Sequence, residues 1–171
     1  MKKTLFIFAT EAEAALLRAQ RPDLQIAICG VGLVESACAM AEILERERPE
    51  QVVLCGIAGA YDKALQVGDV VAVVEERTAT LPAAYRKSYY ATIGLPLKGV
   101  VSNSVMSVGA QPLGAQVENM EGAAIFALCA AQGVLCGQIR AISNYTTDKR
   151  EQWDIPAALK ALTETIDRLY R

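Results

Sequence analysis

Short runs of apolar residues alternate along the chain with segments of helical spacing. The runs that predict strands are residues 5–9, 24–29, 51–55, 69–74, 98–106 and 137–143. The runs at 51–55 and 69–74 are almost entirely apolar, which is typical of strands covered on both faces. This alternation predicts an α/β fold, a three-layer αβα sandwich with a central mixed, largely parallel sheet.

Three segments have the pattern of helices, and they are residues 34–47, 121–132 and 156–170. The first and third place their apolar residues on one face, whereas the second is apolar almost all round and is expected to be buried. The apolar face of the first helix consists of Val34, Ala37, Cys38, Ala41 and Leu44. Asp154 is suited to cap the third helix, and Pro156 fits its first turn.

The middle of the chain has a weaker pattern. Residues 76–97 have no clear period and contain two prolines and three tyrosines, so we expect a loop or an irregular excursion there. No repeat, low-complexity tract or boundary divides the sequence, which predicts a single domain over residues 1–171.

Composition excludes several kinds of chemistry. The chain has 171 residues, a net charge of −2 and no histidine. The lack of histidine excludes Ser-His-Asp and Cys-His mechanisms and His-ligated metal sites. We therefore expect no metal and no cofactor, with carboxylates and amides doing any chemistry. The near-neutral charge predicts no nucleic-acid partner.

Cysteine usage and the first residues indicate the compartment. The five cysteines lie in apolar stretches without a CxxC pair, which predicts buried, reduced side chains. The apolar run near the start, about six residues long, is too short for a signal peptide, and Glu11 and Glu13 follow it. No stretch approaches the ~20 apolar residues of a membrane span. We therefore expect a cytoplasmic protein without a membrane partner.

Glycines follow two of the predicted strands. Gly59 belongs to the stretch 56–60, where the backbone either approaches a ligand closely or makes a tight turn after the strand 51–55. Gly30 and Gly32 also follow a strand, but no third glycine completes a dinucleotide fingerprint, so NAD is not expected.

Charged residues stand at the ends of other elements. Glu121 opens the buried helix and needs polar partners such as ribose hydroxyls, unless it only complements the helix dipole. Arg140, inside an apolar strand, is expected to pair with a carboxylate, for function or only as a structural ion pair. Glu13 follows the first strand, where it could serve as an acid or base or could simply lie in a solvated loop.

Parallel strands end at one sheet edge, so one ligand site is expected there. Its candidate residues are Glu13, Gly59, Glu121 and Asn144.

In this order the motifs resemble those of the nucleoside phosphorylase and nucleosidase superfamily. The matching stretches are 9–13, 56–60 with 67–71, 120–124 and 140–144, and they cover most of the chain. The resemblance implies cleavage of a purine N-glycosidic bond through an oxocarbenium-like sugar, with a small-molecule purine nucleoside as the substrate. It also implies a homodimer or a higher homo-oligomer.

The resemblance also implies roles for individual residues. The catalytic positions are Glu13, Glu121 and Asn144, and the substrate-binding positions are Ala58, Gly59, Met120, Arg140 and Ser143. Glu13 matches the position that handles the attacking water, and Glu121 matches the position that holds the ribose hydroxyls. Asn144 matches the position that faces purine N7, with Ser143 and Arg140 as its supports.

Within the superfamily, the finer resemblance is to futalosine hydrolases of menaquinone biosynthesis. It is carried by residues 118–124, by 142–145 and by Lys149, Arg150, Trp153 and Ile155. In methylthioadenosine/S-adenosylhomocysteine nucleosidases an Asp proton donor occupies the position of Asn144. An amide instead accepts from N7–H while donating to a 6-oxo group, so Asn144 predicts a 6-oxopurine such as hypoxanthine.

Water is the predicted nucleophile. Ile57 stands where related phosphorylases commonly have a serine, and Arg18 and Arg21 are the only candidates for an anion site after the first strand. The remaining alternatives are a methylthioadenosine/S-adenosylhomocysteine nucleosidase, a purine nucleoside phosphorylase and a catalytically impaired relative that binds nucleosides.

The alternative of a catalytically impaired relative follows from the length of the chain. Compared with typical relatives, the chain is expected to be shortened around residues 76–97. Base-stacking side chains come from this region in relatives, and the candidates here are Tyr85, Tyr89 and Tyr90.

Overall fold

The computed structural model describes residues 3–171. Its strands are β1 Thr4–Phe8, β2 Gln25–Ile28, β3 Gln51–Ala60, β4 Val70–Arg77, β5 Ser88–Tyr90, β6 Lys98–Ser104, β7 Val117–Asn119 and β8 Leu135–Tyr145. Its helices are α1 Glu11–Gln20, α2 Leu33–Glu47, α3 Gly122–Gln132 and α4 Ile155–Leu169, with 3₁₀ turns at Ala83–Tyr85 and Arg150–Gln152. Each predicted strand and helix has a counterpart, and the structure adds α1, β5 and β7.

A mixed sheet of eight strands forms the centre of the molecule. Its order is β2-β1-β3-β7-β6-β4-β5, and β8 pairs with both β3 and β4. β3 is parallel to β1 and β8, whereas β4 is antiparallel to β8 and β7 is antiparallel to β3. The pairings β3–β8–β4–β6–β7 lead back to β3, so part of the sheet closes on itself around buried aliphatic side chains.

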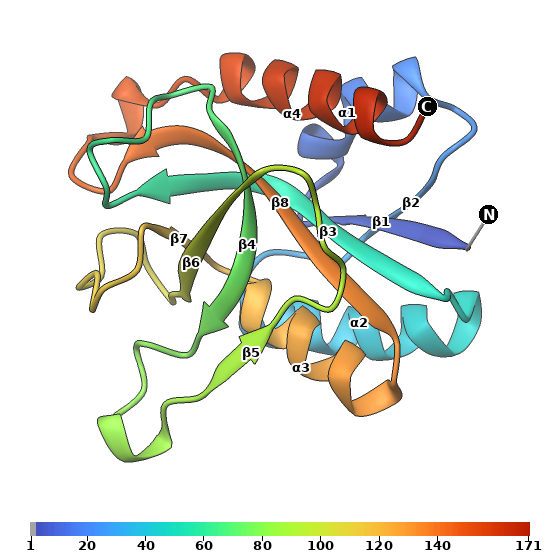
Figure 1. The fold of residues 1–171 in the computed structure, drawn as a ribbon, viewed down its shortest axis with the longest axis horizontal. Coiled ribbons are helices and arrows are strands. Elements are labelled where there is room, and N and C mark those ends of the chain that lie inside the picture. The colour runs from blue at the N-terminus through green and yellow to red at the C-terminus, as the bar shows by residue number, and fades with distance from the viewer. Residues whose placement is uncertain (1–2) are drawn as a thin grey trace.

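Helices cover both faces of the sheet (Figure 1). α1 and α4 lie on one face, and α2 and α3 lie on the other. This arrangement confirms the predicted three-layer α/β architecture. In the described part of the chain, no helix is both long and apolar enough to cross a membrane.

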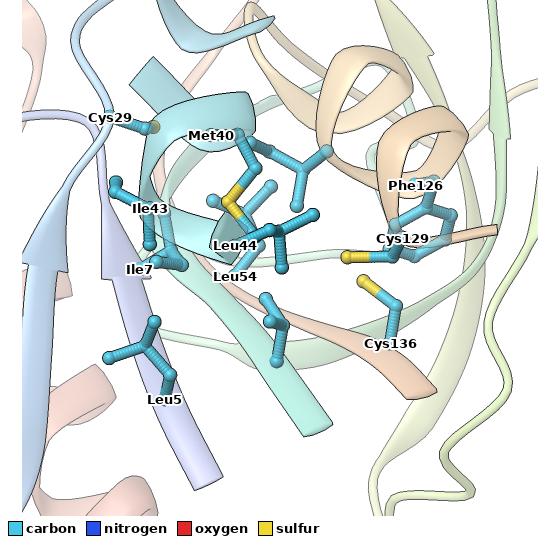
Figure 2. Packing of buried hydrophobic residues seen from close by; sticks show 12 residues of the cluster. Leu5, Ile7, Cys29, Met40, Ile43, Leu44, Leu54, Phe126, Cys129 and Cys136 are labelled. Carbon is cyan, nitrogen blue, oxygen red and sulfur yellow. The ribbon is translucent and has the colours of Figure 1, made fainter. Parts of the chain in front are cut away.

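One hydrophobic core lies between the sheet and the layer of α2 and α3. Figure 2 shows Met40, Ile43 and Leu44 of α2 close to Ile7 of β1, while Phe126 and Cys129 of α3 lie near Cys136 of β8. A second core joins β1, β3 and β8 to α1 and α4. Because the sheet is buried on both sides, the strand ends are held rigidly, and the loops that follow them are the natural place for a ligand.

α2 buries a different face from the predicted one. Its buried residues are Ser36, Met40, Ile43 and Leu44. Val34, Cys38 and Ala41 of the predicted stripe are exposed instead, because burying the larger Met40 and Ile43 removes more apolar area from water. The prediction of buried cysteines therefore fails at Cys38, while the other four cysteines are buried and free.

α1 begins where the sequence indicated only the end of a strand. Thr10 caps this helix by accepting a hydrogen bond from Glu13 N at 3.2 Å. The helix buries only Ala14 and Leu17. Two buried positions make no recognisable stripe, which explains why periodicity missed α1.

β3 and β4 run further than predicted. Residues 56–60 stay in β3 and pair with 140–145 of β8, so there is no tight turn after Cys55. β4 continues to Arg77, which places Glu76 in a strand and leaves the predicted irregular region to begin only after β4. That region contains the short strand β5 and a 3₁₀ turn.

Candidate active site

A cavity of about 490 Å³ opens beside the ends of β1, β3, β7 and β8. All eight site residues indicated by the sequence line it, and they are Glu13, Ala58, Gly59, Met120, Glu121, Arg140, Ser143 and Asn144. The structure therefore brings together residues that are up to 131 positions apart, since Glu13 and Asn144 border one space. Within residues 3–171, no group of three or more acidic or cysteine side chains is arranged to hold a metal ion.

Glu13 projects toward β3 from the first turn of α1. Its Oε1 accepts a hydrogen bond from Ile57 N at 3.2 Å, and its Oε2 accepts one from Thr10 Oγ1 at 3.1 Å. Gly56 makes this approach possible, because a Cβ there would lie 2.6 Å from Arg140 Nη1 and 3.1 Å from Glu13 Oε1. The carboxylate is partly exposed, so each oxygen keeps a lone pair for a ligand or water.

Glu121 and Arg140 form an ion pair in the wall of the cavity. Arg140 Nη2 lies 3.3 Å from Glu121 Oε2, and the two residues are only 1% and 4% exposed. Gly32 N donates to Glu121 Oε1 at 3.2 Å. The predicted pairing of Arg140 with a carboxylate is thus confirmed. Glu121 makes no side-chain cap to α3, so its carboxylate faces these partners and the cavity rather than the helix end.

Asn119 connects this ion pair to the start of α3. Its Oδ1 accepts hydrogen bonds from Arg140 Nη2 at 2.9 Å, Glu121 N at 2.9 Å and Gly122 N at 2.7 Å. Its Nδ2 donates to Glu76 Oε2 at 2.8 Å and to Ser102 Oγ at 2.8 Å. The amide therefore fixes both the guanidinium and the backbone that carries Glu121.

Glu76 lies behind Asn119 and is fully buried. Its carboxylate also accepts from Ser104 Oγ at 2.9 Å and from Gln138 Nε2 at 3.1 Å. Burial raises the pKa of Glu76, and the charge of Arg140 together with these hydrogen bonds opposes the rise. A Cβ at position 122 would overlap Glu76 Oε2, so Gly122 is required where α3 begins. Sequence reasoning missed Glu76; the only signal was a carboxylate at the end of an apolar strand.

Asn144 occupies another part of the cavity wall and is 1% exposed. Its Oδ1 accepts from Ser143 Oγ at 2.8 Å, and its Nδ2 donates to the Tyr145 carbonyl at 2.8 Å. One N–H and one lone pair of this amide remain. Gly59 packs against it, since a Cβ there would lie 3.2 Å from Asn144 Nδ2.

Glu118 is a second buried carboxylate that sequence reasoning did not single out. It accepts hydrogen bonds from Tyr61 OH at 2.5 Å, Gly109 N at 2.7 Å and Ala110 N at 3.2 Å. Burial, with the hydrogen bond to Glu118, raises the pKa of Tyr61. Glu118 thereby anchors the loop that places Val108 in the cavity wall.

The remaining wall comes from the segment between β8 and α4 and from α4 itself. Arg150, Trp153, Ile155 and Leu159 line the cavity here. The guanidinium carbon of Arg150 lies 4.2 Å from the centre of the Trp153 ring. The three tyrosines proposed for base stacking do not line the cavity, and Trp153 is the aromatic residue that does.

Comparisons with known proteins agree with this architecture. The family model described as the phosphorylase superfamily matches residues 18–92 and 72–171. Futalosine hydrolase of Thermus thermophilus is 31% identical over 82% of this chain and 78% of its own length. A 5'-methylthioadenosine/S-adenosylhomocysteine nucleosidase of Bacillus cytotoxicus is 38% identical over 39% of this chain and 29% of its own.

Two solved structures, one of each kind of enzyme, have the same fold. Futalosine hydrolase of Helicobacter pylori superposes with a TM-score of 0.85 at 15% identity, over 98% of this chain and 97% of that one. The Neisseria meningitidis 5'-methylthioadenosine/S-adenosylhomocysteine nucleosidase in complex with methylthio-immucillin-A gives 0.81 at 21% identity, over 99% and 98%. With the family model matching nearly the whole sequence and a relative of 31% identity beside it, the chain belongs to the phosphorylase superfamily.

Proposed function

We propose that this protein is a purine nucleosidase that hydrolyses the N-glycosidic bond of futalosine and releases hypoxanthine. The observation that carries the proposal is Asn144, an amide with one N–H and one lone pair to spare, in the same cavity as Glu13 and Glu121. The futalosine hydrolase of 31% identity supports the choice of substrate.

Glu121 is the proposed partner of the ribose. Gly32 N donates to Oε1 of its carboxylate and Arg140 donates to Oε2, so each oxygen keeps a lone pair for the 2′ and 3′ hydroxyls. As the bond to the base breaks, positive charge builds up on the sugar. A fixed, nearly buried carboxylate beside that sugar stabilises the charge without having to reorganise.

Glu13 is the residue proposed to bind the attacking water and to accept its proton. Ile57 N and Thr10 Oγ1 orient the carboxylate, and its partial exposure leaves room for a bound water molecule. The carboxylate accepts a proton from this water as the water attacks C1′ of the sugar. General-base catalysis of this kind is worth about 10²–10⁴ in rate.

Asn144 is the proposed partner of the leaving base. N7 of the bound nucleoside carries no hydrogen, so it takes a proton from a water molecule as the C1′–N9 bond breaks. The Asn144 oxygen then accepts a hydrogen bond from N7–H, while its nitrogen donates to O6 and stabilises the negative charge that remains there. The 6-amino group of adenine is a donor and would face another donor. The amide therefore favours 6-oxopurines.

The cations of the cavity favour water over phosphate as the nucleophile. Arg140 is already bonded to Glu121, Asn119 and the Ile57 carbonyl. Arg18 pairs with Glu11 instead of lining the cavity. Likewise, Arg21 pairs with Asp23 and Asp167 away from it. Arg150 alone does not make the several-donor anion site that a phosphorylase needs.

The test is an assay of base release. Purified protein is incubated with futalosine, methylthioadenosine or inosine, with and without phosphate, and the products are separated by chromatography. The proposal expects hypoxanthine from futalosine without phosphate. Adenine from methylthioadenosine as the dominant product would assign the nucleosidase alternative instead, and strict dependence on phosphate would assign a phosphorylase. Purine binding by calorimetry without release of any base would indicate the impaired relative.

We also propose that the chain forms a homodimer or a higher homo-oligomer. Val34, Cys38 and Ala41 form an apolar stripe on α2 that is exposed in the single chain. Val31, just before α2, is 50% exposed and also lines the cavity. A second copy packed on this face would cover the stripe and border the cavity.

A further inference from the structure

A buried carboxylate behind the cavity has no part in the reaction proposed above. Glu76 of β4 is fully buried and does not line the cavity. An ionised carboxylate in such a place costs stability unless its partners compensate for the lost water. Burial raises the pKa of Glu76, so its charged form is disfavoured in the folded protein. A group that costs stability and lies beside a candidate active site is a candidate for a role in the chemistry.

The partners of Glu76 fit its ionised form. The amide nitrogens of Asn119 and Gln138 can only donate, and both donate to Oε2, at 2.8 and 3.1 Å. Ser104 Oγ accepts from Ala123 N at 2.8 Å, and its own hydrogen is directed to Glu76 Oε1, 2.9 Å away. Three donors therefore converge on the two carboxylate oxygens, and this arrangement favours a negative charge.

Asn119 connects this carboxylate to Arg140. Its Nδ2 donates to Glu76, and its Oδ1 accepts from Arg140 Nη2 at 2.9 Å. Because Glu76 accepts at the nitrogen end of the amide, the oxygen end faces the guanidinium of Arg140 and the backbone N–H of Glu121. The charge of Arg140 also acts on Glu76 and opposes the rise of its pKa. The guanidinium is thus attracted to two carboxylates, Glu121 in the cavity wall and Glu76 behind it.

The balance of these charges matters for the sugar. Arg140 and Glu121 alone would form a neutral ion pair, which gives little stabilisation to a positively charged sugar. With Glu76, two carboxylates share one guanidinium, so one negative charge is left over. We propose that Glu76 is a positioning residue of the reaction: it acts through Asn119 and Arg140 and offsets part of the guanidinium charge, so that Glu121 keeps its negative charge for the sugar cation. This inference rests on the proposed function and deepens it.

Two variants that preserve side-chain size test the role of the charge in turnover. Glu76→Gln removes the charge without leaving a cavity, and Glu75→Gln removes the neighbouring charge, which pairs with Arg77 away from the active-site cavity. Glu76→Gln should lower kcat for hypoxanthine release from futalosine by about tenfold and leave KM within about twofold. The reason is that the sugar is neutral in the bound nucleoside and charged only in the transition state. Glu75→Gln should change neither constant.

Stability separates this role from a purely structural one. At about pH 7.5, Glu76→Gln should unfold in urea at the same concentration as the wild type or a higher one, because the amide avoids the cost of a buried charge. Glu76→Asp keeps the charge but shortens the side chain, so it should be less stable than Glu76→Gln and yet retain more of kcat. A residue that only fills space would give the reverse order in kcat, because the shorter side chain leaves a cavity.

A binding measurement tests the same charge without turnover. 9-Deazainosine is a C-nucleoside that cannot be hydrolysed at a C–N bond, and its analogue with an NH group in place of the ring oxygen is positively charged at neutral pH. Calorimetry gives the ratio of the two dissociation constants, and the wild-type protein should bind the cationic analogue more tightly. The preference should fall by about tenfold in Glu76→Gln and stay unchanged in Glu75→Gln.

Each result decides the question. Equal binding of the two analogues by the wild-type protein overturns the inference, and so does a loss that Glu75→Gln shares. A Glu76→Gln variant that is both slower and less stable than the wild type also overturns it, because the loss would then come from the fold. If the wild type hydrolyses futalosine, an unchanged kcat or an unchanged preference in Glu76→Gln overturns the inference and leaves the proposed function standing. If the wild type releases no base, the proposed function is contradicted, and a preference that falls in Glu76→Gln still supports the inference.

Discussion

At the scale of single residues, two asparagines in the cavity wall differ in what remains free. Asn119 makes five hydrogen bonds, three through Oδ1 and two through Nδ2, so its amide is saturated. Asn144 makes one bond through each atom and keeps a donor and an acceptor. Asn119 therefore holds Arg140 and the backbone of Glu121 in place, and Asn144 is the residue that we propose to meet the base.

Changing Asn144 tests this assignment of base recognition. Asn144→Asp replaces the amide with a group that donates a full proton to N7, which should favour a 6-aminopurine. We expect the ratio of kcat/KM for inosine over adenosine to fall by about a hundredfold, the lower end of the rate effect of proton donation. An unchanged ratio in a folded variant would show that Asn144 does not choose the base.

Glu76 gives a prediction for pH and stability. Because burial raises its pKa in the folded protein above the ordinary value of 4.5, its stabilising contribution is complete below about pH 4.5 and is lost as pH rises through the raised value. Urea unfolding of the wild-type protein and Glu76→Gln across this range measures the effect. We expect the free energy of unfolding of the wild type to fall relative to the variant as pH rises, by about 1.4 kcal/mol per pKa unit.

The pKa of Glu75, the residue next to Glu76, is shifted in the opposite direction. A hydrogen bond from Arg77 lowers the pKa of Glu75, so its contribution is present above pH 4.5 and is lost as pH falls through the lowered value. The wild type should therefore gain stability relative to Glu75→Gln as pH rises. For Glu76, a difference in the free energy of unfolding between wild type and Glu76→Gln that does not change with pH would contradict a raised pKa of this buried carboxyl.

At the scale of elements, the sequence predicted the apolar strands best. The run at 51–55 lies within β3, and the run at 69–74 lies within β4 except for Asp69, because a strand covered on both faces is mostly apolar. α1 was missed since only Ala14 and Leu17 are buried in it. The prediction of which face of α2 is buried was wrong. Small apolar residues occur on two sides of this helix, and the larger Met40 and Ile43 decide which side is buried.

The candidate site likewise contains residues that the sequence could indicate and residues that it could not. Residues in motifs, such as Glu13 and Asn144, could be proposed from the sequence because each stands at the end of a recognisable strand. Glu76 could not, because its partners Ser104 and Gln138 are 28 and 62 positions away and only the closed sheet brings them together. Long-range polar networks leave no periodic signal in a sequence.

The first turn of α1 is expected to serve both stability and chemistry. Thr10→Val removes the cap of the helix and the hydroxyl that donates to Glu13 Oε2. We expect the free energy of unfolding to fall by about 1 kcal/mol and kcat/KM for base release to fall by about fivefold. Thr10→Ser keeps the hydroxyl and should retain most of both; a fall in activity equal to that of Thr10→Val would rule out the role of the hydroxyl.

At the scale of the whole molecule, exposed apolar surface and the cavity lie on adjoining segments. Val31 lines the cavity and precedes α2, whose stripe of Val34, Cys38 and Ala41 faces solvent in the single chain. Light scattering after size exclusion should therefore give a mass of at least twice the 18.3 kDa of one chain. Val34→Glu should reduce the mass toward one chain, while Lys160→Glu on exposed α4 surface should not. A monomer for the wild type at micromolar concentration would refute self-association.

¹⁸O-labelled water reveals which atom replaces the purine on the sugar, because hydrolysis places a water oxygen on C1′. Futalosine is incubated with the protein in labelled, phosphate-free water, with Glu13→Gln as the control, and the products are analysed by chromatography and mass spectrometry. Hydrolysis with Glu13 as the base predicts one labelled oxygen in the sugar product for each hypoxanthine released, and about a hundredfold slower release by Glu13→Gln. No release of hypoxanthine by the wild-type protein, or release only with phosphate and without the label, would contradict it.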